Sequence, residues 1–287
     1  MLTAQERVNL VETESRRLEE YLGSLAANAW DHPSKCDLWS VADVLAHLTW
    51  ASNFFMTAIS RGLKGDVSPP PGWPEAGTSG PEFLNRFIGE QAIEARKALG
   101  DGLVQEFQSR NHQLQELFSS IGPDELDIPC YGAFAPRNVQ SFITGRVQEL
   151  AVHGWDIQAS LEPSVHLFPP TVPIILERIP QWLAGKGLSS FRAPSAGPSN
   201  VGPSTVRYRL ATQVGPNHDI VATGDSCVVE SVGESPGSDA DVFLRCDGEA
   251  AGLLAYGRVN VDSVFGPGSI QGDQTLGNEF LNWLRQP

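Results

Sequence analysis

A glutamate and a histidine stand four residues apart in a segment of helical periodicity that runs from Arg146 to Asp156. Residues four apart on an α-helix lie on one face, a turn from each other, with their Cβ atoms about 6 Å apart. Glu149 and His153 can therefore hold one divalent metal ion without distortion of the backbone. Carboxylates and imidazoles are ordinary ligands of zinc and of several other transition metals.

His47 is the natural candidate for a third ligand, because it lies in a second strongly helical stretch, Val41 to Leu48. Two histidines and one glutamate with an open fourth position are the ligand set of a catalytic zinc site, whereas a structural zinc normally has four protein ligands. Asp156, three residues beyond His153, is a candidate partner that orients an imidazole. The alternative for Asp156 is a surface carboxylate.

The elements that must position these residues are helices in the first two thirds of the chain. The predicted helices cover Thr3–Ala27, Ser40–Leu63, Pro81–Leu99, Leu103–Ile121, Asn138–Leu161 and, more briefly, Val172–Ala184. Ser40 followed by Asp43 matches the capping-box pattern, with Asp in place of the usual Glu, so the helix that carries His47 has a defined start.

Beyond about residue 204 the pattern changes to short alternating runs separated by Gly, Pro, Asp and Asn. The predicted strands are Thr205–Leu210, His218–Thr223, Cys227–Val232 and Asp241–Cys246, and the predicted helices are Gly248–Ala255 and Leu276–Leu284. We therefore expect an α+β protein of two domains. Residues 1–190 form a bundle of four long helices with additions, residues 191–204 a linker rich in Pro, Gly and Ser, and residues 205–287 a small α+β domain with an antiparallel sheet.

Composition limits the possible partners. The chain has 287 residues, 41% hydrophobic and 19% charged, which is ordinary for a soluble globular protein. Its formal net charge of −14 argues against nucleic acid and against an anionic membrane surface. We expect neither a signal peptide nor a membrane span. The four cysteines include no CxxC pair, so we expect reduced thiols in a cytoplasmic protein.

Two segments of the chain resemble the mycothiol-dependent maleylpyruvate isomerase family, a branch of the DinB-like metal-binding bundles. They are Cys36–Leu48 and Arg146–Asp156. The C-terminal region is similar to the small sterol-carrier-like domain that follows the bundle in this family, above all at Ala240–Glu249 and Tyr256–Arg258. The resemblance covers the whole chain, although the loop at residues 66–81, the linker and the tail are expanded.

The resemblance implies a chemistry that joins a metal to a thiol. In the family a His on the second helix and a Glu-x3-His pair on the last bundle helix hold the metal. These residues correspond to His47, Glu149 and His153. The metal binds a low-molecular-weight thiol, by resemblance mycothiol, and lowers its pKa so that a thiolate forms at neutral pH. The thiolate adds to a cis double bond of the substrate, the bond rotates, and elimination returns the trans isomer. Arg258 is the best match for the family's substrate-binding arginine, with Arg245 as the rival.

Several neighbours of the ligand segments have two interpretations each. Arg146, one turn before Glu149, is a candidate contact for the thiol cofactor, and a plain surface arginine is the alternative. Trp39, Trp50 and Trp155 are interpreted as core anchors rather than as platforms for a ligand.

We therefore expect a metal-dependent enzyme, with zinc or another divalent transition metal, that uses a low-molecular-weight thiol. Its reaction is isomerisation of a maleylpyruvate-like diacid, or transfer of the thiol sulfur to a small anionic electrophile. A hydrolase that activates water at the same residues is one alternative. A non-catalytic protein that binds an apolar small molecule is another. We expect a monomer or a homodimer, with no nucleic acid and no membrane as partner.

Overall fold

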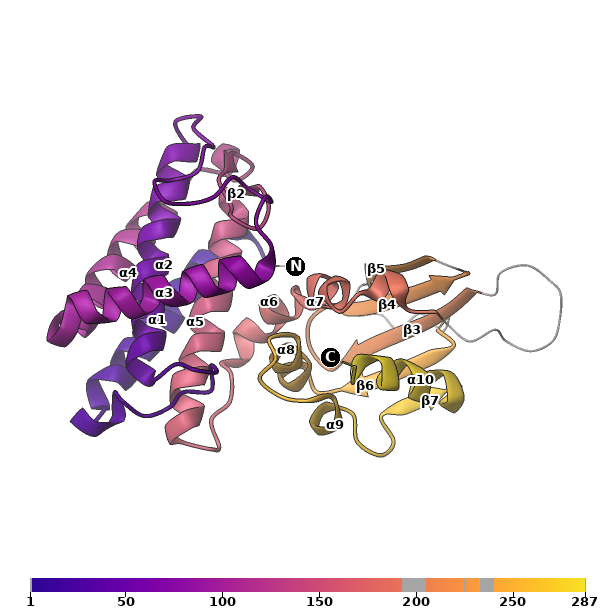
Figure 1. The fold of residues 1–287 in the computed structure, drawn as a ribbon. Coiled ribbons are helices and arrows are strands. Elements are labelled where there is room, and N and C mark those ends of the chain that lie inside the picture. Colours follow the sequence, from indigo (N-terminus) through magenta and orange to yellow (C-terminus); the bar gives the residue numbers. More distant parts are fainter. Residues whose placement is uncertain (1, 193–204, 225, 233–239, 287) are drawn as a thin grey trace. The chain divides into compact units, whose positions relative to one another are not determined.

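The computed structural model describes residues 2–192, 205–224, 226–232 and 240–286, and it divides into two compact units, Met1–Phe168 and Pro169–Pro287 (Figure 1). The division differs from the boundary predicted at residue 190. Residues 169–190 group with the second unit because the helix at Val172–Leu176 packs against the helix at Gly248–Ala255. The predicted linker spans residues 191–204, and its residues 193–204 lie outside the described residues.

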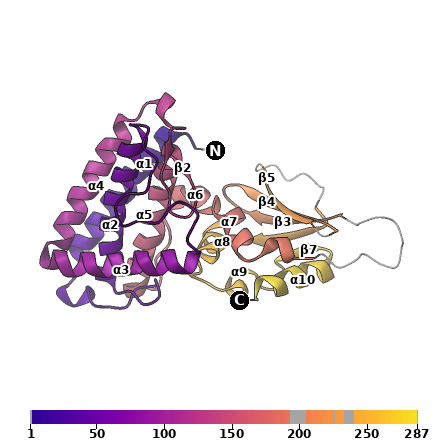
Figure 2. The same cartoon turned by 45° about the horizontal axis from the view of Figure 1, so that its top comes forward.

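The first unit is a helical bundle. Its long helices are α1 (Ala4–Ser24), α2 (Val41–Gly62), α3 (Pro81–Leu99), α4 (Leu103–Ser120) and α5 (Val139–Leu161). α2 packs on α3, α4 and α5, and α1 packs on α4 and α5. α3 runs crosswise to the other long helices (Figures 1 and 2). The predicted bundle is confirmed, with helix ends within a few residues of those expected.

Shorter elements connect these helices. They are η1 (Ala27–Ala29), η2 (Gly100–Gly102), η3 (Pro123–Glu125), β1 (Pro129–Cys130) and β2 (Arg137–Asn138). β1 and β2 form a two-stranded antiparallel ladder immediately before α5.

Side-chain caps fix where α2 and α5 begin. The Asp43 N–H donates to Ser40 Oγ at 3.2 Å, and the Ser40 N–H donates to Asp43 Oδ2 at 2.9 Å, which completes the predicted capping box. At the start of α5, the Ser141 N–H donates to Asn138 Oδ1 at 2.9 Å. A defined first turn sets the face on which every later residue lies, and so the direction of His47 and Glu149.

The second unit contains a mixed five-stranded sheet of order β5-β4-β3-β6-β7. Its strands are β3 (Thr205–Thr212), β4 (Asn217–Thr223), β5 (Ser226–Val232), β6 (Val242–Cys246) and β7 (Ile270–Gly272). β3 pairs antiparallel with β4 but parallel with β6, where Tyr208 lies opposite Val242. The two-domain α+β class is confirmed, while the wholly antiparallel sheet is corrected. Alternation along a strand reports which face is buried, but it carries no information on the direction of the neighbouring strand.

Short helices accompany the sheet. They are η4 (Pro169–Thr171), α6 (Val172–Leu176), α7 (Ile179–Gly185), η5 (Leu188–Ser190), α8 (Gly248–Ala255), α9 (Val261–Val264) and α10 (Gln274–Leu284). The single helix predicted over Val172–Ala184 is therefore two helices. A proline in the first turn of α7 explains the break, because proline has no N–H to continue a preceding helix but fits the start of a new one.

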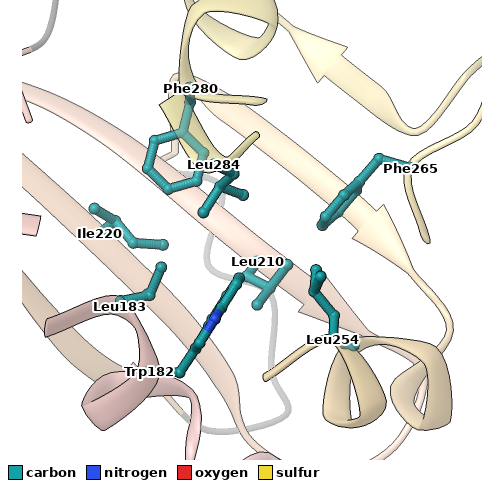
Figure 3. A pocket seen from close by; sticks show the side chains of 9 residues that line it. Trp182, Leu183, Leu210, Ile220, Leu254, Phe265, Phe280 and Leu284 are labelled. Carbon is teal, nitrogen blue, oxygen red and sulfur yellow. The ribbon is translucent and has the colours of Figure 1, made fainter. Parts of the chain in front are cut away.

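A small apolar cavity of about 10 Å³ lies in the core of the second unit (Figure 3). Trp182 of α7, Leu210 of β3, Leu254 of α8 and Phe280 of α10 line it together with other apolar side chains. A volume of ~10–15 Å³ corresponds to about one water molecule, so this cavity holds no larger ligand as it stands. Among the described residues, no helix is long and apolar enough to cross a bilayer.

Candidate metal centre

Three predicted ligand residues come together inside the first unit. His47 Nε2 lies 2.8 Å from Glu149 Oε2, and His153 Nε2 lies 3.5 Å from the same oxygen. One ligand atom from each residue lies within 4.8 Å of the other two. His47 comes from α2, whereas Glu149 and His153 come from consecutive turns of α5, so the packing of α2 on α5 assembles the cluster.

Asp156 orients the ring of His153. His153 Nδ1 lies 2.9 Å from Asp156 Oδ2, and the Asp156 side chain is fully buried. The carboxylate accepts the Nδ1 proton, which leaves the Nε2 lone pair directed toward Glu149. A metal-binding histidine commonly has such a carboxylate behind it. The predicted contact between Asp156 and an imidazole is confirmed, and the surface alternative for Asp156 is wrong.

The electrostatics of the cluster favour the protonation states that a metal needs. Burial lowers the pKa of His47 more than the nearby Glu149 raises it, so His47 is neutral at pH 7. Burial alone would raise the pKa of Glu149, but the hydrogen bond and charge of His47, with His153 and Arg146, hold that pKa well below its ordinary value. A neutral imidazole and an ionised carboxylate are the forms that bind a divalent cation. The donor set therefore fits a metal ion.

A loop before α2 covers the two imidazoles with an indole ring. The ring centroid of Trp39 lies 5.0 Å from that of His47 and 6.2 Å from that of His153. The Trp39 carbonyl is held by the N–H and the hydroxyl of Ser34, at 2.8 and 2.9 Å. Leu38 beside it has φ of 69° and a fully exposed side chain, an uncommon backbone conformation for a branched residue. Trp39 was predicted to be a core anchor, but it is half-buried and borders the candidate site.

The same loop places a thiol near the site. The Cys36 sulfur forms a second group of potential ligands with His153 and Asp156, again within 4.8 Å of one another. Sequence reasoning gave Cys36 no such neighbour, because the nearby imidazole and carboxylate are more than a hundred positions away in the chain. All four cysteines lie within the described residues, and none of them forms a disulfide.

Arg146 is not a surface arginine. Its side chain is completely buried, and it donates to the Leu48 carbonyl at 3.2 Å and to Asn111 Oδ1 at 3.1 Å. Burial lowers its pKa to about 10, against the raising effect of Glu149, so it keeps its charge at pH 7. Arg146 thus ties α5 to α2 and α4 from inside the bundle. Its contact with a thiol cofactor stays a prediction. The hydrogen bonds that the structure shows give Arg146 a structural role in the packing of the bundle.

The two candidate substrate arginines lie in the second unit. Arg258 Nη1 donates to the Tyr256 carbonyl at 2.8 Å, and Arg245 Nε donates to Gln271 Oε1 at 2.8 Å. Arg245 also lies over the ring of Phe243, 5.7 Å from its centroid. Contact of either arginine with a substrate stays a prediction.

Helical fold and ligand set together define a DinB-like helical domain with a candidate metal centre. The family model of the mycothiol maleylpyruvate isomerase N-terminal domain matches residues 11–158, which include His47, Glu149 and His153. The chain belongs to this family.

Solved structures share the fold over nearly the whole chain. The crystal structure of the mycothiol-dependent maleylpyruvate isomerase superposes with a TM-score of 0.59, at 13% identity, over 94% of this chain and 92% of that one. A mutant of the same isomerase gives 0.59 and 13%, over 90% of each chain. This likeness confirms the two-domain α+β fold.

Curated relatives are more limited in extent. Two uncharacterised proteins from two strains of Mycobacterium tuberculosis are each 24% identical over 148 residues, which is 52% of this chain. The match spans about half the length of each relative, 53%.

Proposed function

We propose that this protein is a metal-dependent enzyme that uses a low-molecular-weight thiol as its nucleophile. Its substrate is a small electrophile, and its reaction is cis–trans isomerisation of a maleylpyruvate-like diacid or transfer of the thiol sulfur. The convergence of His47 Nε2, Glu149 Oε2 and His153 Nε2 carries the proposal. Three protein ligands leave a coordination position for an exogenous group, which is the arrangement of a catalytic centre.

The residues of the chain have separate tasks in this proposal. His47, Glu149 and His153 hold the ion, and Asp156 keeps the proton of His153 on Nδ1 so that Nε2 faces the ion. When bound, a divalent metal supplies Lewis-acid chemistry that lowers the pKa of a coordinated thiol. Trp39 shields the two imidazoles, because its ring packs beside both of them. Arg258, or Arg245 in its place, binds the carboxylates of an anionic substrate.

Mycothiol is the thiol that family membership favours, since the family takes its name from a mycothiol-dependent isomerase. Zinc is the metal that we favour, with cobalt, nickel or iron as alternatives that the same ligands accept. Neutral His47 and ionised Glu149 support metal loading at pH 7 without any further proton release from these two groups.

A cobalt-substituted protein tests the proposal. We expect about one metal per chain in the wild type, little metal in His153→Ala, and a sulfur-to-cobalt charge-transfer band when a low-molecular-weight thiol is added to the wild type. Metal without the thiol band, together with hydrolysis of esters or amides in the absence of thiol, would instead select activation of water. No metal in the wild type would overturn the proposal.

The alternative of a binding protein for an apolar molecule has less support. The apolar cavity in the second unit has a volume of about 10 Å³. Ligand pockets typically measure about 300–1,000 Å³, so this core would have to open widely before it could hold an apolar guest.

A further inference from the structure

A second, larger cavity lies in the first unit and has no part in the proposed metal chemistry. Its volume is about 340 Å³, and it is bounded by α2, by α3 and by the loop at residues 70–73. This volume lies within the range of small-molecule pockets, about 300–1,000 Å³. The metal ligands are not among the residues that line it.

Near-parallel aromatic rings form one wall of this cavity. Trp73 stacks on Phe54 with a centroid distance of 4.3 Å and an interplanar angle of 26°, and on Trp50 at 5.4 Å and 18°. Phe87 of α3 meets the Trp73 ring edge-on, at 5.1 Å and 70°. Rings that share an orientation favour a flat guest, because a planar π-system can stack parallel to them or meet a ring edge at right angles.

The loop that carries Trp73 has a hydrogen-bonded turn before the indole and is anchored to residues 131–133 after it. The backbone N–H of Trp73 donates to the Pro70 carbonyl at 3.0 Å, and the Tyr131 hydroxyl donates to the Pro74 carbonyl at 2.6 Å. A little further on, the Gly77 N–H donates to the Ala133 carbonyl at 3.1 Å. The wall is therefore built before any guest arrives, which reduces the ordering cost of binding.

The other side chains that α2 and α3 contribute to the cavity are polar but carry no charge. Asn53 and Thr57 of α2 and Gln91 of α3 contribute two amides and a hydroxyl, and none of the described residues that line the cavity is ionisable as an acid or a base. None of the described lining residues is a cation that could compensate an anionic guest, and the chain as a whole carries a net charge of −14. An amide provides both donors and an acceptor, so it suits a neutral group that does the same.

We propose that this cavity binds an uncharged, planar aromatic molecule that bears a hydrogen-bonding substituent such as an amide. The flat part packs against the wall that Trp50, Phe54 and Trp73 form, and Asn53 or Gln91 makes a hydrogen bond with the substituent. Trp50 lies three residues after His47, so the cavity begins about one helical turn along α2 from the candidate metal centre. The proposal does not rest on the proposed function, because the two sites share no residue.

Naphthalene-2-carboxamide is the probe for this proposal, measured by isothermal titration calorimetry on the full chain. Naphthalene-2-carboxylate tests charge with the same ring, and methyl α-glucoside tests a neutral ring that is not planar. We expect the carboxamide to bind at least tenfold more tightly than either of them. Trp73→Ala should weaken its binding about tenfold, through loss of stacking. Trp30→Ala, at a half-buried tryptophan outside the cavity, should leave it unchanged.

A filling variant guards against a simple loss of folding. Thr57→Phe places a large ring in the cavity without removal of any aromatic wall residue, and it should abolish carboxamide binding while the circular dichroism spectrum stays that of the wild type. His153→Ala should bind the carboxamide as the wild type does, so failure of the metal proposal and failure of this one are distinguishable. Binding that is equal for the three probes, or unchanged in both Trp73→Ala and Thr57→Phe, would overturn the proposal.

Discussion

The proton position on His153 decides what the candidate metal centre can hold. Asp156 sits behind the ring at 2.9 Å, and its side chain is fully buried, so the imidazole is held in the tautomer that turns Nε2 toward Glu149. His47 has no such partner, since among the described residues nothing bonds its buried Nδ1. The His153 ring is therefore held by a hydrogen bond at Nδ1, whereas the His47 ring is held only by packing and by the contact of its Nε2 with Glu149 Oε2.

Replacement of Asp156 by Asn should weaken metal binding about 10- to 100-fold, because an amide is a weaker acceptor for the Nδ1 proton and can also present its own N–H. Competition against a chelator of known affinity measures the change. Asp37→Asn, at an exposed position of the neighbouring loop, serves as the control and should bind metal as the wild type does. Equal affinities in all three proteins would show that Asp156 has no role in orienting the ligand.

The sequence was sufficient to predict the three candidate ligands but not their surroundings. A four-residue spacing on one helix is a local property, so Glu149 and His153 could be paired without a structure. Cys36 and Trp39 reach the site only because their loop folds back toward α5, which no local pattern reports. For Arg146 the charge of the side chain indicated a surface position, yet the side chain is buried. Its hydrogen bonds to the Leu48 carbonyl and to Asn111 Oδ1 replace the contacts with water that a surface position would give.

At the scale of elements, α1 carries a carboxylate on its buried face. Burial raises the pKa of Glu14 from its ordinary 4.5 to about 7, although Arg17, 3.5 Å away, acts to lower it. The folded chain therefore keeps this proton at pH values where the unfolded chain releases it. Stability from this group is complete below about pH 4.5 and is lost as the pH rises through about 7.

Glu14→Gln should remove this loss, so that at pH 8 the variant is more stable than the wild type by up to about 3 kcal/mol, while at pH 4 the two are similar. Urea unfolding across this pH range measures the difference. The exposed Glu12→Gln on the same helix is the control and should follow the wild-type profile. A stability difference between Glu14→Gln and wild type that is the same at pH 4 and pH 8 would contradict the assignment.

Two helical glycines should respond to alanine with opposite signs. A Cβ on Gly62, at the end of α2, would lie 2.5 Å from Cys130 Sγ and 2.7 Å from the Pro129 carbonyl, whereas a Cβ on Gly23 in α1 meets nothing within 4 Å. Gly62→Ala should cost about 1–3 kcal/mol through overpacking against β1. Gly23→Ala should stabilise by about 0.5 kcal/mol, because alanine loses less backbone entropy. Chemical denaturation of both variants tests the pair.

Helix existence was predictable at this scale, whereas strand direction was not. The periodicity of five long helices and the cap of α2 depend only on residues close together in the sequence, and the structure confirms both. The parallel pairing of β3 with β6 depends on how the chain returns to the sheet, which alternation along a strand does not encode. The helix predicted over Val172–Ala184 is divided into α6 and α7 for a local reason, the proline near the start of α7.

For the whole molecule, the division into two compact units has a consequence for thermal unfolding. All three candidate ligands and Asp156 belong to the unit Met1–Phe168, and a ligand stabilises only the part of a protein whose folded state it binds. The division into compact units falls after residue 168, whereas the sequence pattern placed the boundary near residue 190 because α6 and α7 are helical like the bundle.

Metal removal should therefore lower the midpoint temperature of one calorimetric transition of the full chain and leave that of the other unchanged. At a metal concentration of about 100 times Kd the stabilisation is about 2.7 kcal/mol, which corresponds to a shift of roughly 5–10 °C for a unit of this size. Differential scanning calorimetry with and without a chelator makes the measurement, with His153→Ala as the control that the chelator leaves unchanged. Equal shifts in both transitions would contradict the confinement of the site to the first unit.

The distance along the chain between His47 and Glu149 bears on how the bundle forms. Their contact joins residues 102 positions apart, across α3 and α4. Closure of so long a loop is entropically costly, and contacts of high sequence separation slow folding. An isolated α5 already presents Glu149 and His153 together, but the third ligand arrives only when α2 has docked. A metal ion bound early by α5 would gain its third ligand only when α2 docks. High metal affinity would therefore report that the bundle has formed.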